Sequence, residues 1–335
     1  MKEAAMNIAI IGAGTWGTAL ARILCNAGHQ IAVWSALPAE IEDLRKTRRH
    51  RNLPGMEIPE GIRFTADEKE ACAGKEMLIF AVPSVYVRGT AGRIAPYAGP
   101  GQLIVDVAKG IEPGTLETMS QVIGDVIPDV PTAVLSGPTH AEEVAQDLPT
   151  TAVSACGDIR LAEKVQSIFT DTCMRIYTNT DVLGVELCGA LKNVIALAAG
   201  ISAGLGYGDN TKAALITRGL AEMRRLGLAM GCRDETFAGL AGIGDLIVTA
   251  TSRHSRNNQC GYLIGQGYRP QEAIEKVGMV VEGINALPAA MCLAQKYGVE
   301  MPIVEAVNRI IHDGGNPADT VGLLMGRKLK TEWMK

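Results

Sequence analysis

Short runs of consecutive apolar residues alternate with amphipathic stretches through the first half of the chain. The run Met77–Val82 is apolar at every position, which is typical of a strand buried on both faces of a parallel sheet. Stretches between such runs, for example 16–27 and 159–169, show helical patterns. This alternation predicts a doubly wound α/β domain. The predicted strands are 7–11, 30–34, 77–82, 102–107, 132–135, 151–155 and 174–177.

The strand pattern ends near residue 180, and only helical patterns with Gly or Pro stops follow it. We therefore expect a doubly wound domain over residues 1–189 and an all-α domain over 190–335. No low-complexity linker separates them, so a rigid junction is expected. The predicted helices of the second part are 181–203, 210–230, 257–265, 270–277, 283–297 and 303–312.

A glycine-rich segment, Gly12-Ala-Gly14-Thr-Trp-Gly17, lies between the first predicted strand and the first predicted helix. Gly12 allows a tight turn, Gly14 lets the backbone approach phosphates, and Gly17 lets the helix pack closely on the strand. The helix N-terminus then offers free N–H groups and its positive dipole end to an anion. In this strand–turn–helix context the motif predicts a binding site for a dinucleotide pyrophosphate.

Composition narrows the class of protein further. The chain has 335 residues, 47% of them hydrophobic and 20% charged, which is typical of a soluble globular protein. A net charge of −4 argues against a nucleic-acid binder. Neither a signal peptide nor an apolar run long enough to span a membrane is visible. Scattered cysteines and histidines without ligand spacing predict a cytoplasmic protein without a metal site.

Two lysines occur where chemistry is expected. Lys192 stands in an apolar helical stretch, so its side chain either extends to the surface or faces a cavity. Burial would lower its pKa, because water no longer stabilises the ammonium group, and would suit it to general acid–base catalysis. Lys109 follows strand 102–107 at the sheet edge where ligands bind in such folds. A surface lysine after a strand is also common.

Two later turns carry further polar side chains. The three glycines of Gly239–Leu246 can hold Asp245 close to a ligand. Ser255 is a suitable N-cap, and Arg256 beside that helix N-terminus would make a phosphate site.

The segment Ser136–Glu142 follows another predicted strand. Thr139 and Glu142 fit a capping box at a helix start, while Gly137 and the free N–H groups can contact a ligand. We assign His140 no function, since a single histidine in a capped turn is more often structural.

These motifs, in this order, resemble the bacterial NAD(P)-dependent glycerol-3-phosphate dehydrogenases over nearly the whole chain. The fold implied is a Rossmann-type doubly wound sheet followed by an all-α C-terminal domain, with substrate bound between them. The matching segments are 12–20, Asn-Leu-Pro-Gly 52–55, Ala-Val-Pro-Ser 81–84, Ala-Lys-Gly 108–110, Ser-Gly-Pro-Thr 136–139, Ala-Leu-Lys-Asn 190–193, 239–246, Ser-Arg-Asn 255–257 and Val-Glu-Gly 281–283.

The resemblance implies hydride transfer between NAD(P)H and dihydroxyacetone phosphate, giving sn-glycerol 3-phosphate for phospholipid synthesis, with Lys192 as proton acceptor. A homodimer is a possible assembly. The residues implied around glycerol phosphate are Lys109, Gly137, Thr139, Lys192, Asp245, Ser255, Arg256 and Asn257. The residues implied at the dinucleotide are Gly12, Gly14, Thr15, Trp16, Gly17, Lys109, Ala141, Arg256, Val280 and Glu282.

The choice between NAD and NADP stays open. Ser35-Ala36 follows the second predicted strand and supplies neither a carboxylate for a ribose hydroxyl nor a cation for a 2′-phosphate. Arg48, Arg49 and Arg51 are alternative cations, so weak discrimination is expected. Two other functions also remain: a hydroxyacid or 6-phosphogluconate-type dehydrogenase, and a dinucleotide sensor without catalysis.

Overall fold

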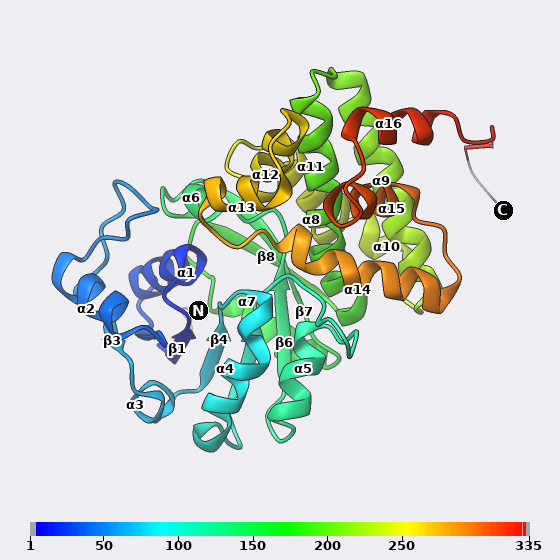
Figure 1. Ribbon diagram of the computed structural model, residues 1–335. Coiled ribbons are helices and arrows are strands. Elements are labelled where there is room, and N and C mark those ends of the chain that lie inside the picture. Colours follow the sequence, from blue (N-terminus) through cyan, green and yellow to red (C-terminus); the bar gives the residue numbers. More distant parts are fainter. Residues whose placement is uncertain (1–4, 330, 333–335) are drawn as a thin grey trace.

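Eight strands form one sheet in the computed structural model, which describes residues 5–329 and 331–332 (Figure 1). Their spatial order is β3-β2-β1-β4-β5-β6-β7-β8. The strands are β1 Asn7–Ile11, β2 Gln30–Trp34, β3 Arg63–Thr65, β4 Met77–Phe80, β5 Leu103–Asp106, β6 Thr132–Ser136, β7 Thr150–Ala155 and β8 Met174–Asn179.

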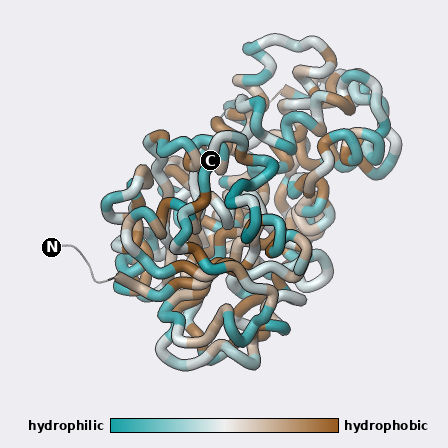
Figure 2. The backbone as a smooth tube through the Cα atoms, turned by 90° about the vertical axis from the view of Figure 1, so that its left-hand side faces the viewer, coloured by the Kyte–Doolittle hydropathy of each residue, from teal (hydrophilic) through white to brown (hydrophobic). Residues whose placement is uncertain are grey.

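Both faces of the sheet are buried, as the unbroken apolar runs predict. In β1, Ile8 and Ile10 enter the core on one face, whereas Ala9 and Ile11 enter a second core on the other face. Successive side chains of a strand point to opposite faces, so a strand covered on both sides must be apolar at every position. Figure 2 shows these hydrophobic residues, in brown, along the backbone through the middle of the sheet domain.

Helices cover the two faces and confirm the predicted doubly wound class. One face is covered by α1 Thr15–Asn26, α2 Pro38–Thr47, α6 Ala141–Val144 and α7 Ile159–Ser167. The other is covered by α3 Glu68–Cys72, α4 Val87–Ile94 and α5 Met119–Val126, with single 3₁₀ turns η1 Ser84–Tyr86 and η2 Ala95–Tyr97.

The sheet differs from the prediction in two respects. The sequence reading missed β3, because three residues are too few to show a periodic pattern. Strands β6 and β7 pair antiparallel, so the sheet is mostly rather than wholly parallel. Their connection contains only the four-residue α6, which does not carry the chain back along the sheet as a long crossover helix would.

The second half is helical, as predicted. Its elements are α8 Val182–Gly204, α9 Asp209–Ala229, α10 Asp234–Phe237, the π-helical turn η3 Leu240–Gly244, α11 Asp245–Thr251, α12 Arg256–Gly265, α13 Pro270–Val277, α14 Glu282–Tyr297, α15 Pro302–Ile311 and α16 Pro317–Met325. Helix α8 runs through the expected boundary at residues 189 and 190, so the division of the chain into domains stays a prediction.

Helix α8 forms the centre of this helical region. It is long and apolar enough to cross a membrane, but 89% of its most apolar window is buried inside the protein. One buried helix of this kind is typical of a core helix and is weak evidence for a membrane span. Helices α9, α11, α12 and α14 pack around it, which leaves most of its side chains buried.

Glycines bring α8 and α12 into backbone contact. A Cβ on Gly200 of α8 would lie 2.1 Å from the Asn258 carbonyl oxygen, and one on Gly261 of α12 would lie 2.1 Å from that of Leu197. Gly204 and Gly265 make the same kind of contact one turn further on. Because side chains at a helix contact set the distance between the axes, these glycines hold the start of α12 close to α8.

Candidate active site

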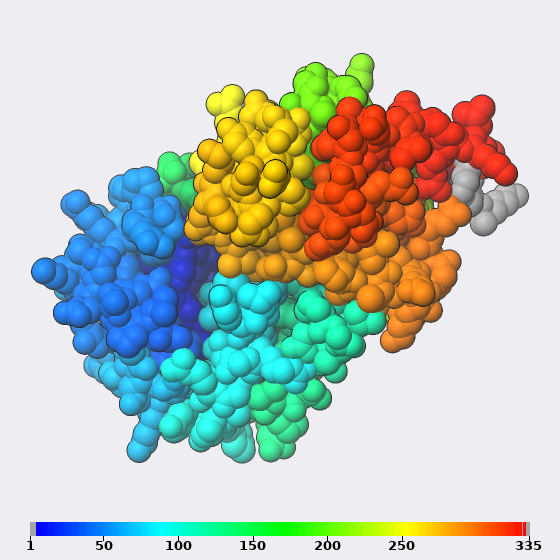
Figure 3. Space-filling model, in the orientation of Figure 1, coloured from blue at the N-terminus to red at the C-terminus, as the bar shows by residue number. Residues whose placement is uncertain are grey.

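The glycine-rich turn has the geometry that its sequence predicts. Gly12 adopts φ +125°, and a Cβ there would lie 2.5 Å from the Ala81 carbonyl oxygen. A Cβ on Gly17 would lie 2.1 Å from the Gly12 carbonyl oxygen, whereas Gly14 faces open space. Figure 3 shows the deep-blue N-terminal segment at the bottom of a hollow between blue, gold and cyan parts of the surface.

The start of α1 fits an anionic ligand. No side chain caps this helix, so its first N–H groups lack partners from the helix or from a cap. The hydroxyl oxygen of Thr15 is buried and has no hydrogen-bond partner. Unpaired donors at a helix N-terminus beside an uncrowded glycine are suited to a pyrophosphate.

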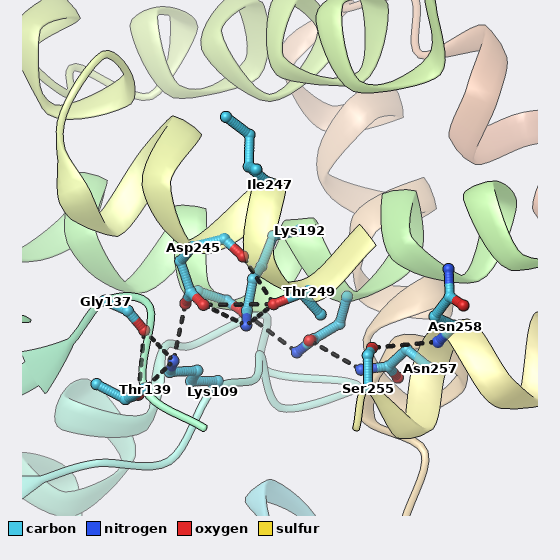
Figure 4. A network of polar contacts seen from close by, with 12 residues as sticks. Lys109, Gly137, Thr139, Lys192, Asp245, Ile247, Thr249, Ser255, Asn257 and Asn258 are labelled. Carbon is cyan, nitrogen blue, oxygen red and sulfur yellow. Dashed lines mark hydrogen bonds and ion pairs between the residues drawn. The ribbon is translucent and has the colours of Figure 1, made fainter. Parts of the chain in front are cut away.

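Three charged side chains meet beyond the carboxyl edge of β5 (Figure 4). Lys192 Nζ donates to Asp245 Oδ1 at 2.7 Å, and Lys109 Nζ donates to Asp245 Oδ2 at 2.8 Å. Lys192 and Asp245 are buried, with relative exposures of 5% and 1%. The sequence left two interpretations of Lys192, a side chain that extends to the surface or one that faces inward. The burial excludes the first.

Protein oxygens complete the contacts of both lysines. Lys109 Nζ donates to the Gly137 carbonyl at 2.9 Å and to Thr139 Oγ1 at 3.3 Å. Lys192 Nζ donates to Thr249 Oγ1 at 2.6 Å. Sequence reasoning missed Thr249; its spacing of four residues from Asp245 on a helix was the available signal.

The π-helical turn η3 places the carboxylate of this cluster. Asp245 is the first residue of α11, directly after η3. A Cβ on Gly242 would lie 2.1 Å from the Phe237 carbonyl oxygen, so the turn closes only with glycine there. Such turns are often found at functional sites.

Burial and charge act against each other in this cluster. The pKa of Lys192 is lowered to about 7: burial is the main cause, Asp245 opposes it, and the Lys109 ammonium adds to the lowering. Burial alone would raise the pKa of Asp245, but Lys109 and Lys192 outweigh it and hold that pKa below its ordinary value. A lysine with a pKa near neutrality can both donate and accept a proton.

A buried amide network joins the start of α12 to α8. Asn257 Nδ2 donates to Asn193 Oδ1 at 2.9 Å, and the Gly283 N–H donates to Asn257 Oδ1 at 2.8 Å. Ser255 is the N-cap of α12, as predicted, and its Oγ accepts from the Asn258 N–H at 3.2 Å. Arg256 lies exposed at the first residue of the helix. The hydrogen bond between Asn257 and Asn193 thus holds the start of α12, with its Ser255 cap, next to the part of α8 that carries Lys192.

The predicted capping box at Thr139 is wrong. Helix α6 begins at Ala141 with His140 as N-cap, so Thr139 lies one residue too early. Its hydroxyl instead donates to the Gly137 carbonyl at 3.1 Å and accepts from Lys109. The His140 ring is partly buried, 6.1 Å from the ring of His254. Burial, followed by the charge of Lys192, lowers the His140 pKa.

Segments of the sheet domain also contact the start of α14. Glu282 accepts from the Ser84 N–H at 3.0 Å and from Ser84 Oγ at 2.5 Å. Asn52 contacts the sulfur of Met279 at 3.8 Å. Segment 81–84 therefore meets segment 281–283, and segment 52–55 contacts the residue Met279 just before it.

The structure thus groups the predicted site residues in two sets. Lys109, Gly137, Thr139, Lys192 and Asp245 share direct hydrogen bonds. Asn257 bonds Asn193, the neighbour of Lys192 in the chain, and Ser255 caps the helix that carries Asn257. Gly12 to Gly17 form the turn, Ala141 lies on α6, which packs against α1, and Glu282 contacts Ser84. No hydrogen bond or ion pair joins partly buried Val280 or exposed Arg256 to either set among the described residues. Among the described residues, no group of three or more His, Cys, Asp or Glu could hold a metal.

A doubly wound sheet with this turn, followed by a helical region that supplies a buried lysine, defines a Rossmann-type dinucleotide-binding protein. The family model described as the NAD-dependent glycerol-3-phosphate dehydrogenase N-terminus matches residues 7–162. The model of the C-terminus of the same family matches residues 181–322. The chain belongs to this NAD-dependent glycerol-3-phosphate dehydrogenase family.

Individual relatives agree with the family models. The chain is 60% identical to glycerol-3-phosphate dehydrogenase [NAD(P)+] 2 of Lactobacillus delbrueckii subsp. bulgaricus, over 98% of this chain and 99% of that protein. It is 53% identical to the Agathobacter rectalis glycerol-3-phosphate dehydrogenase [NAD(P)+], over 97% of each. The crystal structure of glycerol-3-phosphate dehydrogenase from Coxiella burnetii superposes with a TM-score of 0.93 at 37% identity, covering 96% of this chain and 99% of that one.

Proposed function

We propose that this chain interconverts dihydroxyacetone phosphate and sn-glycerol 3-phosphate with NAD(H) or NADP(H). One observation carries the proposal: in a chain of this family, a buried lysine paired with a carboxylate stands at the same carboxyl edge of the sheet as a turn shaped for a dinucleotide. The nicotinamide supplies or accepts the hydride when it is bound. The glycine-rich turn of the sheet domain holds the pyrophosphate of the dinucleotide, and side chains from both parts of the chain surround the substrate next to Lys192.

Lys192 moves the proton in this proposal. In ketone reduction its ammonium group donates a proton to the oxygen that becomes the C2 hydroxyl; in alcohol oxidation the neutral amine takes that proton back. Asp245 and Thr249 orient Nζ through hydrogen bonds of 2.7 and 2.6 Å. The pKa of about 7 supports both directions, because both protonation states are populated near neutral pH.

The phosphate is proposed to lie at the start of α12. The Ser255 cap leaves N–H groups of the first turn free, and exposed Arg256 adds a fixed positive charge. Lys109, Gly137 and Thr139 close the opposite side of the substrate, next to Asp245. The dinucleotide contacts are proposed for Gly12, Gly14, Thr15, Trp16, Gly17, Lys109, Ala141, Arg256, Val280 and Glu282.

The test is a spectrophotometric assay of the purified chain with dihydroxyacetone phosphate and either NADH or NADPH. We expect reduced cofactor to be consumed with the phosphorylated ketone, and far more slowly with unphosphorylated dihydroxyacetone. Turnover of 6-phosphogluconate or a hydroxyacid in its place would assign the other dehydrogenase class. Dinucleotide binding without any turnover would assign a sensor.

A further inference from the structure

The carboxyl end of β2 lies directly beside the glycine-rich turn. The Gly12 N–H donates to the Trp34 carbonyl at 2.8 Å, and Ser35 follows immediately. In Rossmann folds the adenosine ribose lies near this strand end, where a carboxylate recognises a free 2′-hydroxyl or a cation recognises a 2′-phosphate. Neither Ser35 nor Ala36 carries such a charge.

The fold brings a carboxylate to the end of β2, that of Glu40, which lies five residues after Ser35. Helix α2 begins at Pro38, and its first turn brings Glu40 back over the strand end. Ser35 Oγ donates to Glu40 Oε2 at 2.6 Å and accepts from the Leu37 N–H at 3.2 Å. The orientation of the carboxylate is therefore set by a buried hydroxyl. The α2 dipole also favours a negative charge in the first turn.

His50 is a buried group on which the charge of Glu40 acts. Its ring is buried, and its Nδ1 accepts from the Asn52 N–H at 3.2 Å. Burial lowers the His50 pKa, Glu40 and the Ala13 backbone oppose that shift, and the charge of Arg51 adds to it. The ring thus responds both to the glycine-rich turn, through Ala13, and to the carboxylate of Glu40.

The competing cations are less well placed. Arg48 donates to the Ile62 carbonyl at 2.8 Å and lies over the Phe64 ring, 5.4 Å from its centroid. Its charge is thus directed to the loop that leads into β3. Arg49 and Arg51 are exposed. Among the described residues, no hydrogen bond reaches Glu40 Oε1, so that oxygen is free to accept one.

We propose that Glu40 determines cofactor specificity: its carboxylate accepts a hydrogen bond from the adenosine 2′-hydroxyl and repels a 2′-phosphate, so that the chain prefers NAD(H) to NADP(H). This proposal rests on the proposed function only for the statement that the turn binds a dinucleotide. It replaces the expectation of weak discrimination, which considered only the residues directly after β2.

The experiment measures dissociation constants of ADP-ribose and 2′-phospho-ADP-ribose by titration calorimetry, without substrate or nicotinamide. We expect the wild-type chain to bind ADP-ribose more tightly by about 10-fold or more, the effect of a charge-assisted hydrogen bond. In Glu40→Gln the amide oxygen still accepts from Ser35 but the charge is gone, so this preference should shrink by about 10-fold. Glu42→Gln, the same change at an exposed position of α2, should keep the wild-type ratio.

Two results would overturn the proposal. One is tighter binding of 2′-phospho-ADP-ribose than of ADP-ribose by the wild type. The other is the same ratio of the two dissociation constants in Glu40→Gln as in Glu42→Gln. In the first case, loss of that preference in Arg51→Ala would identify the cation. Failure to bind either ligand would overturn the dinucleotide site as a whole. A preference for ADP-ribose in a chain that does not reduce dihydroxyacetone phosphate would leave the role of Glu40 intact and reject only the proposed substrate.

Discussion

The glycine-rich turn and the lysine–aspartate cluster are built in opposite ways. The turn is one contiguous stretch, Gly12–Gly17, and works through backbone N–H groups and missing side chains. The cluster joins Lys192 and Lys109 to Asp245, which are 53 and 136 residues away along the chain. Phosphate recognition can therefore be local, whereas acid–base chemistry here needs charges brought together from distant segments.

The two regions also differ in what stabilises them. The turn exposes donors to a ligand and buries no charge. The cluster buries ionisable groups, which is unfavourable unless each charge is paired. The two oxygens of Asp245 accept from two different ammonium groups. The single negative charge of the carboxylate can balance only one of these two positive charges. This shortage of negative charge is consistent with a lowered pKa at Lys192, the more deeply buried lysine.

Lys192→Met breaks the cluster and spares the turn, and should have the largest effect. Removing a general acid–base group should lower kcat by about 100- to 10,000-fold. Asp245 keeps Lys109 as its counterion, so the fold should survive. Steady-state kinetics measure the loss, and the NADH dissociation constant should stay near that of the wild type. Lys212→Met, on the surface of α9, is the control; a normal kcat for Lys192→Met would remove this residue from the mechanism.

Arg256→Ala tests the substrate end of the site. A lost charge-assisted contact should lower kcat/KM for dihydroxyacetone phosphate by about 10- to 200-fold. Unphosphorylated dihydroxyacetone should lose much less, because it has no phosphate to contact. Kinetics with both ketones decide the point. Equal losses would show that Arg256 serves the cofactor or the fold.

Gly17→Ala breaks the turn and spares the cluster. The new Cβ would lie 2.1 Å from the Gly12 carbonyl oxygen, so strand and helix must separate. Overpacking of this kind costs about 1–3 kcal/mol, which would weaken NADH binding by about 5- to 150-fold. Gly124→Ala in α5 is the matched control, since no protein atom lies within 4 Å of a Cβ there and the residue is outside the turn, so NADH affinity should stay at the wild-type value. Unchanged NADH affinity in Gly17→Ala would separate the turn from cofactor binding.

The pH dependence of the reaction rates tests the charge balance in the cluster, and we expect the smallest effect there. With a Lys192 pKa of about 7, ketone reduction should slow as pH rises through that value, and alcohol oxidation should accelerate. Lys109→Met removes a like charge and leaves Asp245 to Lys192 alone, so both transitions should move to higher pH. Rate profiles in both directions provide the measurement. Arg256→Ala should leave the transitions in place; a pH profile that Lys109→Met does not move would contradict the electrostatic coupling.

Some features were predictable because their cause is local. The strand–turn–helix start, the Ser255 cap and the helical second half each depend on residues close together in sequence. The Thr139 capping box failed although its pattern was present, because Lys109 and Gly137 use that hydroxyl. Thr249 and Glu40 were overlooked because each becomes informative only next to its partner, Lys192 or Ser35.

By itself the sequence determined the two kinds of architecture, the phosphate-binding turn and the family, since apolar periodicity and glycine spacing act over a few residues. The tertiary structure decided the antiparallel β6–β7 pair, the burial of Lys192 against Asp245, and the position of Glu40 at the end of β2. These depend on which distant atoms end up within a few ångströms of each other. The pKa of a buried lysine is set by such neighbours, which no single stretch of the chain records.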